Sequence, residues 1–287
     1  MPTLYVVATP IGNLGDMTPR AIETLKSVSL IAAEDTRVTQ KLLSAFDIHT
    51  PLTSCHEHNE RGKAAQIVRR MLEEDIDVAV TTDAGTPCIS DPGSALVRAA
   101  VESGIETVAV PGPTAMAAAL SVSGYEISEF TFFGFLPRQK GELKEKLLDM
   151  ARRSRLAVVH ESPHRVRELL ATVGETLPHT MVSASCDLTK KYEKTLRGPV
   201  AQVLEAVEQN PKAEKGEYCL VFAWAGEDIP APEAPKSTLS LEARLFDGLA
   251  RGMSLRESME EVTAQGERKN AVYAASLRVK QLMADAD

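Results

Sequence analysis

The sequence has few cysteines and no long apolar run. Its four cysteines are widely scattered and form no C-x-x-C pair, so neither a disulfide framework nor a cysteine-based zinc site is expected. The longest apolar runs, such as Ala115 to Leu120, are far too short to cross a bilayer, and no signal-peptide pattern follows Met1. We therefore expect a cytoplasmic protein with reduced thiols, no membrane span and no metal ion.

The charge of the chain is negative overall but unevenly distributed. A net charge of -8 argues against indiscriminate nucleic-acid binding. Residues 136–200, however, carry 13 Lys and Arg against 8 Asp and Glu, whereas residues 1–135 carry 9 against 17. A local basic face can steer a polyanion even when the total charge is negative. The alternative interpretation of this basic block is an ordinary solvated helix surface.

Apolar runs of strand length alternate with helical patterns in the first half of the chain. Strands that are buried on both faces read as continuous apolar runs, and helices between them indicate a parallel sheet with crossovers. We therefore predict an α/β domain over residues 1–135. Its expected strands are Leu4–Thr9, Leu30–Ala33, Val78–Thr82, Thr107–Val110 and Phe130–Phe133.

The second half of the chain divides into three parts. The stretch "GFLPRQKG", residues 134–141, interrupts the alternation of strands and helices and predicts a linker. A second α/β domain with a mixed sheet is expected over 136–226, so its start overlaps this linker. Residues 227–238 form a Pro-rich spacer. Residues 239–287 predict a tail of three short helices with helix-turn-helix character. The tail is either a nucleic-acid module, against which its acidic balance argues, or a bundle that packs on the body or a partner.

The first expected strand ends in "VATPIGNLGDMT", residues 7–18, which resembles a phosphate-binding loop only superficially. Pro10 stands where a Rossmann loop needs a glycine, and proline lacks the N–H that binds phosphate. A later loop, "TTDAGTPCISDPG", also follows a strand, and ligands in α/β sheets bind at such ends. Asp83 and Asp91 could accept hydrogen bonds from a ligand, although Asp91 could equally cap the next helix.

Three further segments carry candidate residues, two of them at strand ends and one before an expected helix. In "VPGPTAMAAAL", Thr114 and Ala115 leave room for close approach to the backbone, although tight helix packing also explains them. In "AAEDTR", Asp35 and Arg37 form either a catalytic cluster or a helix cap with an ion pair. In "CHEHNER", the histidines lack the i, i+4 spacing of a helical zinc site.

Two segments of the second half supply positive charge. "VVHESPHR" contains Glu161, His164 and Arg165, and "DLTKKYEKTLRG" contains a group of lysines. If the protein binds a phosphodiester, these side chains are the natural phosphate contacts.

The ordered set of motifs resembles the ribosomal RNA small subunit methyltransferase I family, within the tetrapyrrole methylase superfamily. The motifs are "LYVVATPIGNLGDMT", "IAAEDTR", "HEHNE", "TDAGTPCISDPG", "VPGPTAMAAALSVSG", "FFGFLP", "ESPHR" and "LTKKYE", and "RKNAVYAASL" matches in the tail. The resemblance implies two α/β domains with S-adenosyl-L-methionine in the cleft between them, in a homodimer. It also implies methylation of a cytidine ribose 2'-hydroxyl in 16S rRNA of the small ribosomal subunit.

The resemblance assigns cofactor contacts, whereas the roles in the chemistry are a hypothesis from the residue types. A ribose hydroxyl is a poor acid, so we expect Asp35 as the proton acceptor, with Arg37 and Lys190 as electrostatic helpers. The expected cofactor contacts are Pro10, Ile11, Asp83, Ala84, Gly85, Thr86, Thr114, Ala115, Glu161 and Ser162. The expected substrate contacts are His56, His58, Asn59, His164, Arg165 and Lys191.

Two alternatives remain open at this point. One is a methyltransferase that acts on a tetrapyrrole or another small acceptor, for which the basic block would not be needed. The other is a nucleic-acid-binding regulator that uses the tail helices. The acidic chain with its basic patch favours an assembled ribosomal particle as the substrate.

Overall fold

The computed structural model describes residues 1–210, 213–229 and 239–284. The chain divides into two compact units, Met1–Ile229 and Pro230–Asp287. Most of the spacer expected at 227–238 lies outside the described residues. Its first two residues belong to the short 3-10 helix η2 (Gly226–Asp228). Within the described part of the chain, no helix is long and apolar enough to span a membrane.

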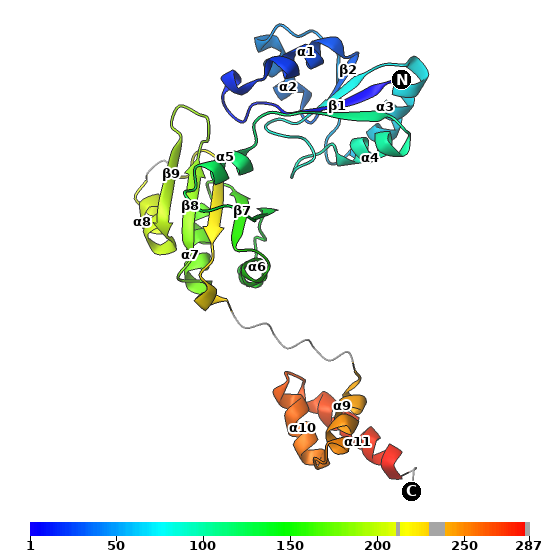
Figure 1. The fold of residues 1–287 in the computed structure, drawn as a ribbon, viewed down its shortest axis with the longest axis vertical. Coiled ribbons are helices and arrows are strands. Elements are labelled where there is room, and N and C mark those ends of the chain that lie inside the picture. The colour runs from blue at the N-terminus through cyan, green and yellow to red at the C-terminus, as the bar shows by residue number, and fades with distance from the viewer. Residues whose placement is uncertain (211–212, 230–238, 285–287) are drawn as a thin grey trace. The chain divides into compact units, whose positions relative to one another are not determined.

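The first unit begins with a parallel sheet of five strands (Figure 1). Its apolar strands are buried on both faces, so successive residues of one strand pack into the two cores on opposite sides of the sheet. Val80 packs in the core that contains Ile67 and Leu96, whereas Ala79 packs in the core that contains Leu25. In spatial order the strands are β3 (Leu52–Ser54), β2 (Leu30–Ala33), β4 (Val78–Thr81), β1 (Thr3–Val7) and β5 (Glu106–Val110).

Helices cover both faces of this sheet. Thr18 caps the first of them, since its hydroxyl accepts a hydrogen bond from the Ala21 amide at 3.1 Å, and Pro19 occupies the first helical position. Because all five strands are parallel, their carboxyl ends meet at one edge, where the connecting loops gather. The helices are α1 (Pro19–Ser27), α2 (Thr36–Ala45), α3 (Glu60–Glu74) and α4 (Ser94–Glu102), and η1 (Leu14–Asp16) precedes α1.

A second, mixed sheet follows in the same unit. Its first two strands are parallel, and the other neighbours are antiparallel. In spatial order the strands are β6 (Thr131–Phe135), β7 (Leu156–Glu161), β10 (Tyr218–Ala223), β8 (Met181–Cys186) and β9 (Lys194–Pro199). One face packs on α6 (Lys140–Arg153), α7 (Val166–Thr176) and α8 (Val200–Glu208), and the other on α5 (Ala115–Ser121).

The chain enters the second sheet earlier than the sequence indicated. The apolar run near Phe130–Phe133 was expected in the first sheet, but β6 pairs with β7, and α5 packs on the second sheet through Ala119 and Leu120. That strand assignment is therefore wrong. An apolar run reports burial but not which of two adjacent sheets buries it, so the pattern could not have separated the two.

The tail forms three helices around its own core, as the sequence predicted. The helices are α9 (Leu241–Ala250), α10 (Leu255–Ala264) and α11 (Lys269–Ala284). Their buried residues are Leu245, Val262, Val272, Ala275 and Val279. Breaks at Gly252 and Gly266, both with positive φ, separate the helices because glycine adopts this conformation without steric cost.

Candidate functional site

A cavity of about 350 Å³ opens in the first unit where the loops at the carboxyl edge of the first sheet meet the second sheet. Both sheets contribute walls, so the cavity depends on the way that the two α/β halves are packed. The residues that line it are Ile11, Ala84, Ser90, Asp91 and Ala115 from the first half or α5, and Phe135, His160, Glu161, Ser162, Pro163, Leu188, Glu217, Tyr218 and Cys219 from the second.

The loops after β1 and β4 are joined directly. The Thr9 amide donates to the Gly85 carbonyl at 2.9 Å, and the Gly85 amide returns a bond to the Thr9 carbonyl at 3.0 Å. Gly85 has φ +90°, a conformation that side chains disfavour, and a Cβ there would touch Ile11. The glycine thus lets the two loops pair and brings Ile11 and Ala84 to the cavity wall.

The loop after β5 approaches β1 just as closely. A Cβ at Gly112 would lie 2.9 Å from the Cβ of Ala8, so only glycine fits this crossing. Thr114 then precedes α5 without making a side-chain cap, and Ala115 contributes a small side chain to the cavity. The small residues at this corner serve close backbone packing and an open wall at the same time.

The loop between β4 and α4 carries two residues in the left-handed region, Cys88 with φ 71° and Ser90 with φ 65°. Such conformations cost about 1–3 kcal/mol each and cluster at functional sites. Asp91 follows and lines the cavity. Burial raises the pKa of Asp91 to about 6, and the nearby carboxylates of Glu34 and Asp83 add to the rise.

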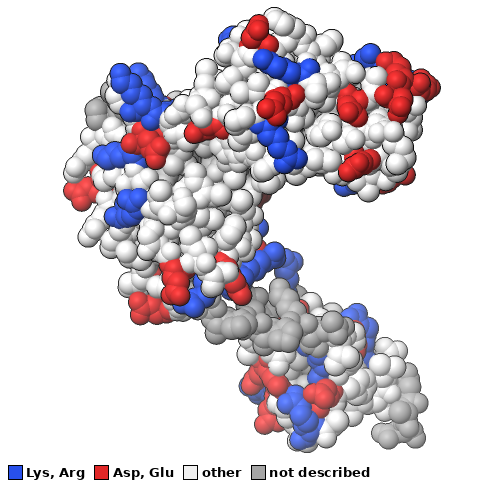
Figure 2. All heavy atoms as spheres, turned by 45° about the horizontal axis from the view of Figure 1, so that its top comes forward, with Lys and Arg blue, Asp and Glu red and all other residues white. Residues whose placement is uncertain are grey.

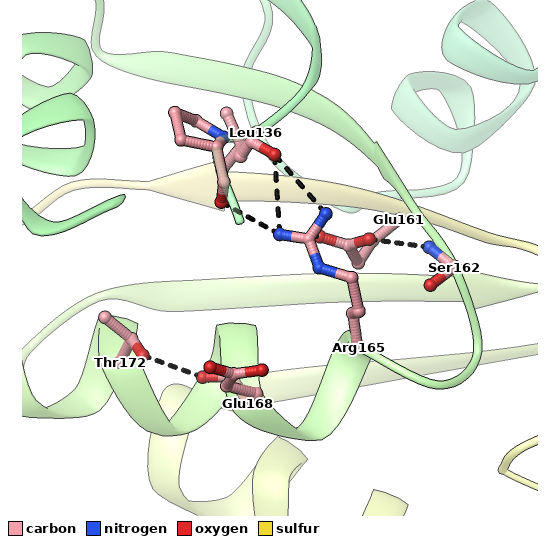
Figure 3. Close-up of polar contacts among 7 residues, drawn as sticks. Leu136, Glu161, Ser162, Arg165, Glu168 and Thr172 are labelled. Carbon is pink, nitrogen blue, oxygen red and sulfur yellow. Dashed lines mark hydrogen bonds and ion pairs between the residues drawn. The ribbon is translucent and has the colours of Figure 1, made fainter. Parts of the chain in front are cut away.

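The end of β7 supplies a buried carboxyl group (Figure 3). The side chain of Glu161 is 1% exposed, and its Oε1 accepts a hydrogen bond from the Ser162 amide at 2.7 Å. Its Oε2 has no hydrogen-bond partner and lies 3.5 Å from Nη2 of Arg165. Burial raises the pKa of Glu161, a rise that the Ser162 amide and Arg165 oppose. Apart from this ion pair, the buried Oε2 is an acceptor that receives no hydrogen bond.

Arg165 was expected to contact substrate, and its guanidinium points into the protein (Figure 3). It donates to the Pro137 carbonyl at 2.9 Å and to the Leu136 carbonyl at 3.4 Å. The side chain therefore connects the chain after β6 to the end of β7. His164, beside it, is exposed.

The cavity has an acidic and aromatic character. His160 lies edge-on to Phe132 and tilted against Phe135, with ring centroids 5.0 and 5.8 Å away, and burial lowers its pKa, so the ring is neutral at pH 7. The other ionisable residues of the lining include the carboxyl groups of Asp91, Glu161 and Glu217, and none of the lysines and arginines that the structure describes belongs to it. The lining therefore suits a ligand with apolar surface and positive charge.

Half of the expected cofactor contacts line this cavity: Ile11, Ala84, Ala115, Glu161 and Ser162. The other half lie in the same turns and the same corner but outside the lining: Pro10, Asp83, Gly85, Thr86 and Thr114.

Asp35 and Arg37 lie at the start of α2. Asp35 caps the helix, because its Oδ1 accepts from the Arg37 amide at 2.8 Å, and its Oδ2 lies 2.6 Å from Nη2 of Arg37. These hydrogen bonds hold the pKa of Asp35 well below its usual range. Neither residue lines the cavity. A carboxylate stabilised in this way is a weak proton acceptor at neutral pH.

The expected contacts of the histidine-rich segment form a turn before α3. The Asn59 side chain accepts from the His56 amide at 2.9 Å and contacts the His56 ring at 3.0 Å. His58 and Asn59 line a separate open cavity of about 430 Å³ together with Arg61 and Arg98. Within the described residues, no group of His, Cys, Asp and Glu is arranged to hold a metal ion.

Lys190 lies beside the main cavity. Its Nζ is 2.8 Å from Glu217 and 3.2 Å from Asp187, and its side chain passes so close to Gly12 that a Cβ there would lie 2.6 Å from Cγ. Lys191 lies over the Tyr192 ring, 5.6 Å from its centroid. Basic side chains gather near the tip of the β8–β9 hairpin (Figure 2).

Sequence reasoning missed most of the second-half wall. Of its residues only Glu161 and Ser162 were predicted, although His160 precedes them directly and Tyr218 begins a neighbouring antiparallel strand. The signal was present in part, since Phe135 and His160 stand at the carboxyl ends of parallel strands. Ser90 was not singled out, because a strained loop conformation is not visible in sequence.

Comparisons with known proteins agree on one group. A family model described as tetrapyrrole (corrin/porphyrin) methylases matches residues 3–204. Proteins named ribosomal RNA small subunit methyltransferase I are similar over nearly their whole length. That of Synechocystis sp. is 41% identical over 98% of this chain and 99% of its own, and that of Bacillus subtilis is 39% identical over 96% and 94%.

Two solved structures share the fold. The uroporphyrin-III-C-methyltransferase of Thermus thermophilus has a TM-score of 0.52 at 19% identity and covers 80% of this chain and 100% of its own. The methyltransferase CobJ has a TM-score of 0.56 at 18% identity and covers 78% of this chain and 95% of its own. At these identities the likeness concerns the two-sheet architecture alone.

Proposed function

This chain belongs to the tetrapyrrole methylase family and is an S-adenosylmethionine-dependent methyltransferase, and on that premise we propose that it methylates a cytidine ribose 2'-hydroxyl in 16S ribosomal RNA. The observation that carries the proposal is the similarity over 98% of the chain to a protein named as a methyltransferase of ribosomal RNA, tail included. A match confined to the two sheets would have left the acceptor open. We further propose a cytoplasmic enzyme, because small ribosomal subunits are found there.

The main cavity suits S-adenosylmethionine. Glu161 lines the cavity and its Oε2 receives no hydrogen bond, so this carboxyl group offers an acceptor to an amine or hydroxyl donor, and the carboxyl groups of Asp91 and Glu217 favour a cationic ligand. Ile11 and Ala115 add apolar surface for a nucleoside. We assign these residues, with Ala84 and Ser162, to the cofactor, and the turns of Pro10, Asp83, Gly85, Thr86 and Thr114 to its support.

Asp91 is the proposed proton acceptor. S-adenosylmethionine, when bound, would supply a methyl group from its sulfonium sulfur and would leave as the neutral thioether S-adenosylhomocysteine. The proton of the hydroxyl that is methylated would pass to the Asp91 carboxylate. Asp91 lines the cavity and has a pKa of about 6, near the operating pH, as effective general bases do. Asp35 was the acceptor expected from sequence, but its pKa is depressed by Arg37. We therefore propose that Asp35 and Arg37 position the start of α2.

The RNA contacts are proposed to lie on exposed side chains outside the lining of the main cavity. Lys191 and His164 are exposed, as is His58 in the second cavity beside Arg61 and Arg98. Cations that neutralise phosphates supply affinity without reading sequence. Lys190, engaged with Glu217, is proposed to hold the rim rather than to take part in the chemistry.

A homodimer is also proposed. The connection between α5 and β6 exposes three apolar side chains close together in sequence, Val122, Ile127 and Phe130, with exposed fractions of 38 to 42%. Exposed apolar patches are typical of interfaces, so we propose these three side chains as part of the contact between the two copies.

The acceptor class is tested by offering the enzyme two substrates in parallel. Tritiated S-adenosylmethionine is incubated with small ribosomal subunits from a strain that lacks this enzyme, and separately with uroporphyrinogen. Label in the subunits alone supports the proposal. Label in the tetrapyrrole alone would move the assignment to the small-acceptor branch of the family.

A further inference from the structure

The tail has a rigid turn between its last two helices. Arg244 is 9% exposed and donates to Glu267 at 2.7 Å and to the Gln265 side chain at 2.6 Å. These bonds fix residues 265–268, which connect α10 to α11, and Gly266 makes the bend with φ +95°. The start of α11 is therefore held in a defined position on its own three-helix core.

The charges of the tail are paired selectively. Among the residues that the structure describes there, five carboxylates are in ion pairs: Glu242, Asp247, Glu260, Glu261 and Glu267. The sixth, Glu257, closes the capping box of α10 with Ser254. Figure 2 accordingly shows acidic and basic side chains interspersed on the visible face of the tail.

The basic residues left without an ion pair all belong to the α11 end of this unit. Among the described residues of the tail, Arg268, Lys269 and Lys280 have no carboxylate within 4.0 Å. The excess of acidic residues in the tail argued against nucleic-acid binding, but the carboxylates described there all have partners within the tail. The uncompensated charge that a partner meets on this helix is positive.

These cations share a helix face with an exposed aromatic ring. Positions 269, 273, 277 and 280 are spaced by three or four residues and lie on one side of α11, next to the buried side that contains Val272 and Val279. Tyr273 is 59% exposed and Leu277 is 49% exposed. Lys269, Asn270 and Tyr273 also form one wall of an open groove of about 670 Å³ against α10.

We propose that this α11 face, defined as Lys269, Asn270, Tyr273, Leu277 and Lys280, binds an unpaired segment of RNA. The inference rests on the proposed function, since the RNA is that of the substrate particle. Lysines at the two ends of the face neutralise backbone phosphates, and an exposed tyrosine between them offers a surface on which an unpaired base stacks. Asn270 supplies donor and acceptor groups for a base edge.

The charge pattern favours RNA over a protein partner. An aromatic ring flanked by unpaired cations matches the stacking-and-phosphate arrangement of single-strand recognition. A second copy of the tail would bring the same positive face against itself, which like charges oppose.

The test uses the full-length protein and two variants of the face. Lys269→Gln/Lys280→Gln removes two charges, and Tyr273→Ala removes the ring. The matched control is Lys26→Gln/Arg69→Gln, since both residues are exposed, lack an ion pair and stand near the ends of α1 and α3, on the edge of the first sheet away from the cavity. Affinity for naked 16S RNA and for small subunits is measured at several salt concentrations, alongside methyl transfer to small subunits.

The double variant should bind more weakly, with the slope of log affinity against log salt reduced by about 1.4 to 1.8, because two phosphate contacts are lost. Tyr273→Ala should lose about 5- to 100-fold in affinity, and the control should match the wild type. Equal binding by all variants, with methyl transfer intact in the wild type, would overturn the inference and leave the proposed function standing. Weakened binding to subunits but not to naked RNA would assign the face to a ribosomal protein and overturn it as well. A wild type that binds RNA without methylating any subunit would instead refute the proposed function.

Discussion

Replacing Asp91 should separate catalysis from folding. The pKa of about 6 means that the carboxylate form makes up about nine-tenths of the enzyme at pH 7 and about one-tenth at pH 5. If this carboxylate accepts the proton, kcat at pH 5 should be about a tenth of its value at pH 7. Asp91→Asn should lower kcat at pH 7.5 by about 100-fold or more. It should also abolish the rise in kcat that is centred near pH 6.

The stability of the same variant should move in the opposite direction. The pKa of Asp91 is raised on folding, from 3.8 to about 6, so its ionised form destabilises the folded state above the unfolded value. This cost is absent well below pH 3.8 and complete above pH 6. The full shift would correspond to about 3 kcal/mol, and solvent screening at this half-buried site reduces the cost below that figure. Asp91→Asn should therefore raise the free energy of unfolding at pH 7.5 while it lowers activity.

The assay follows tritium transfer to small subunits between pH 5 and 8 at saturating cofactor, with cofactor affinity measured by calorimetry at each pH. Asp35→Asn is the control, because the pKa of Asp35 lies well below this range and its loss should leave the pH profile unchanged. If Asp91→Asn retains the rise in kcat near pH 6, or if Asp35→Asn removes it, Asp91 is not the proton acceptor.

Three further changes test the cavity and its support. Glu161→Gln should weaken cofactor binding about tenfold in calorimetry, since one acceptor oxygen becomes a donor, and unchanged affinity would exclude this side chain from the cofactor site. Gly85→Ala should destabilise the protein by about 1–2 kcal/mol in denaturant unfolding, because its φ of +90° disfavours a side chain, and a neutral result would show that the turn adapts. Arg165→Met should lower the free energy of unfolding by about 1–3 kcal/mol, because the carbonyl oxygens of Leu136 and Pro137 lose their donor. Arg165→Lys, which keeps the charge, should recover part of this loss. If RNA affinity falls while stability is unchanged, Arg165 contacts RNA directly instead.

The parallel sheet was predictable because its strands are buried on both faces. Leu30–Ala33 and Val78–Thr81 are continuous apolar runs, and such runs have few alternatives to a buried strand. β9 was missed, since Lys194–Pro199 is largely polar and exposed and carries the pattern of a loop. The placement of β6 failed because apolar composition does not say which sheet buries a strand.

The site was predictable where a loop follows a parallel strand and less so elsewhere. Ile11 and Ala84 were named through the family resemblance, and both line the cavity because they follow parallel strands, at the ends where α/β sheets bind ligands. Asp35 and Asp91 were both visible as acids near such ends. Only the structure shows that hydrogen bonds from Arg37 lower the pKa of Asp35 and that burial raises the pKa of Asp91. Pairing of charges between distant residues, as in the tail, is likewise absent from a count of acids and bases.

The most direct test of the central claim is the identity of the methylated nucleoside. Small subunits from a strain without this enzyme are incubated with the purified protein and S-adenosylmethionine, and their 16S RNA is digested and analysed by mass spectrometry. The account predicts one new 2'-O-methylcytidine per subunit. A methyl group on a base, or RNA that stays unmodified while the protein binds cofactor, would contradict it.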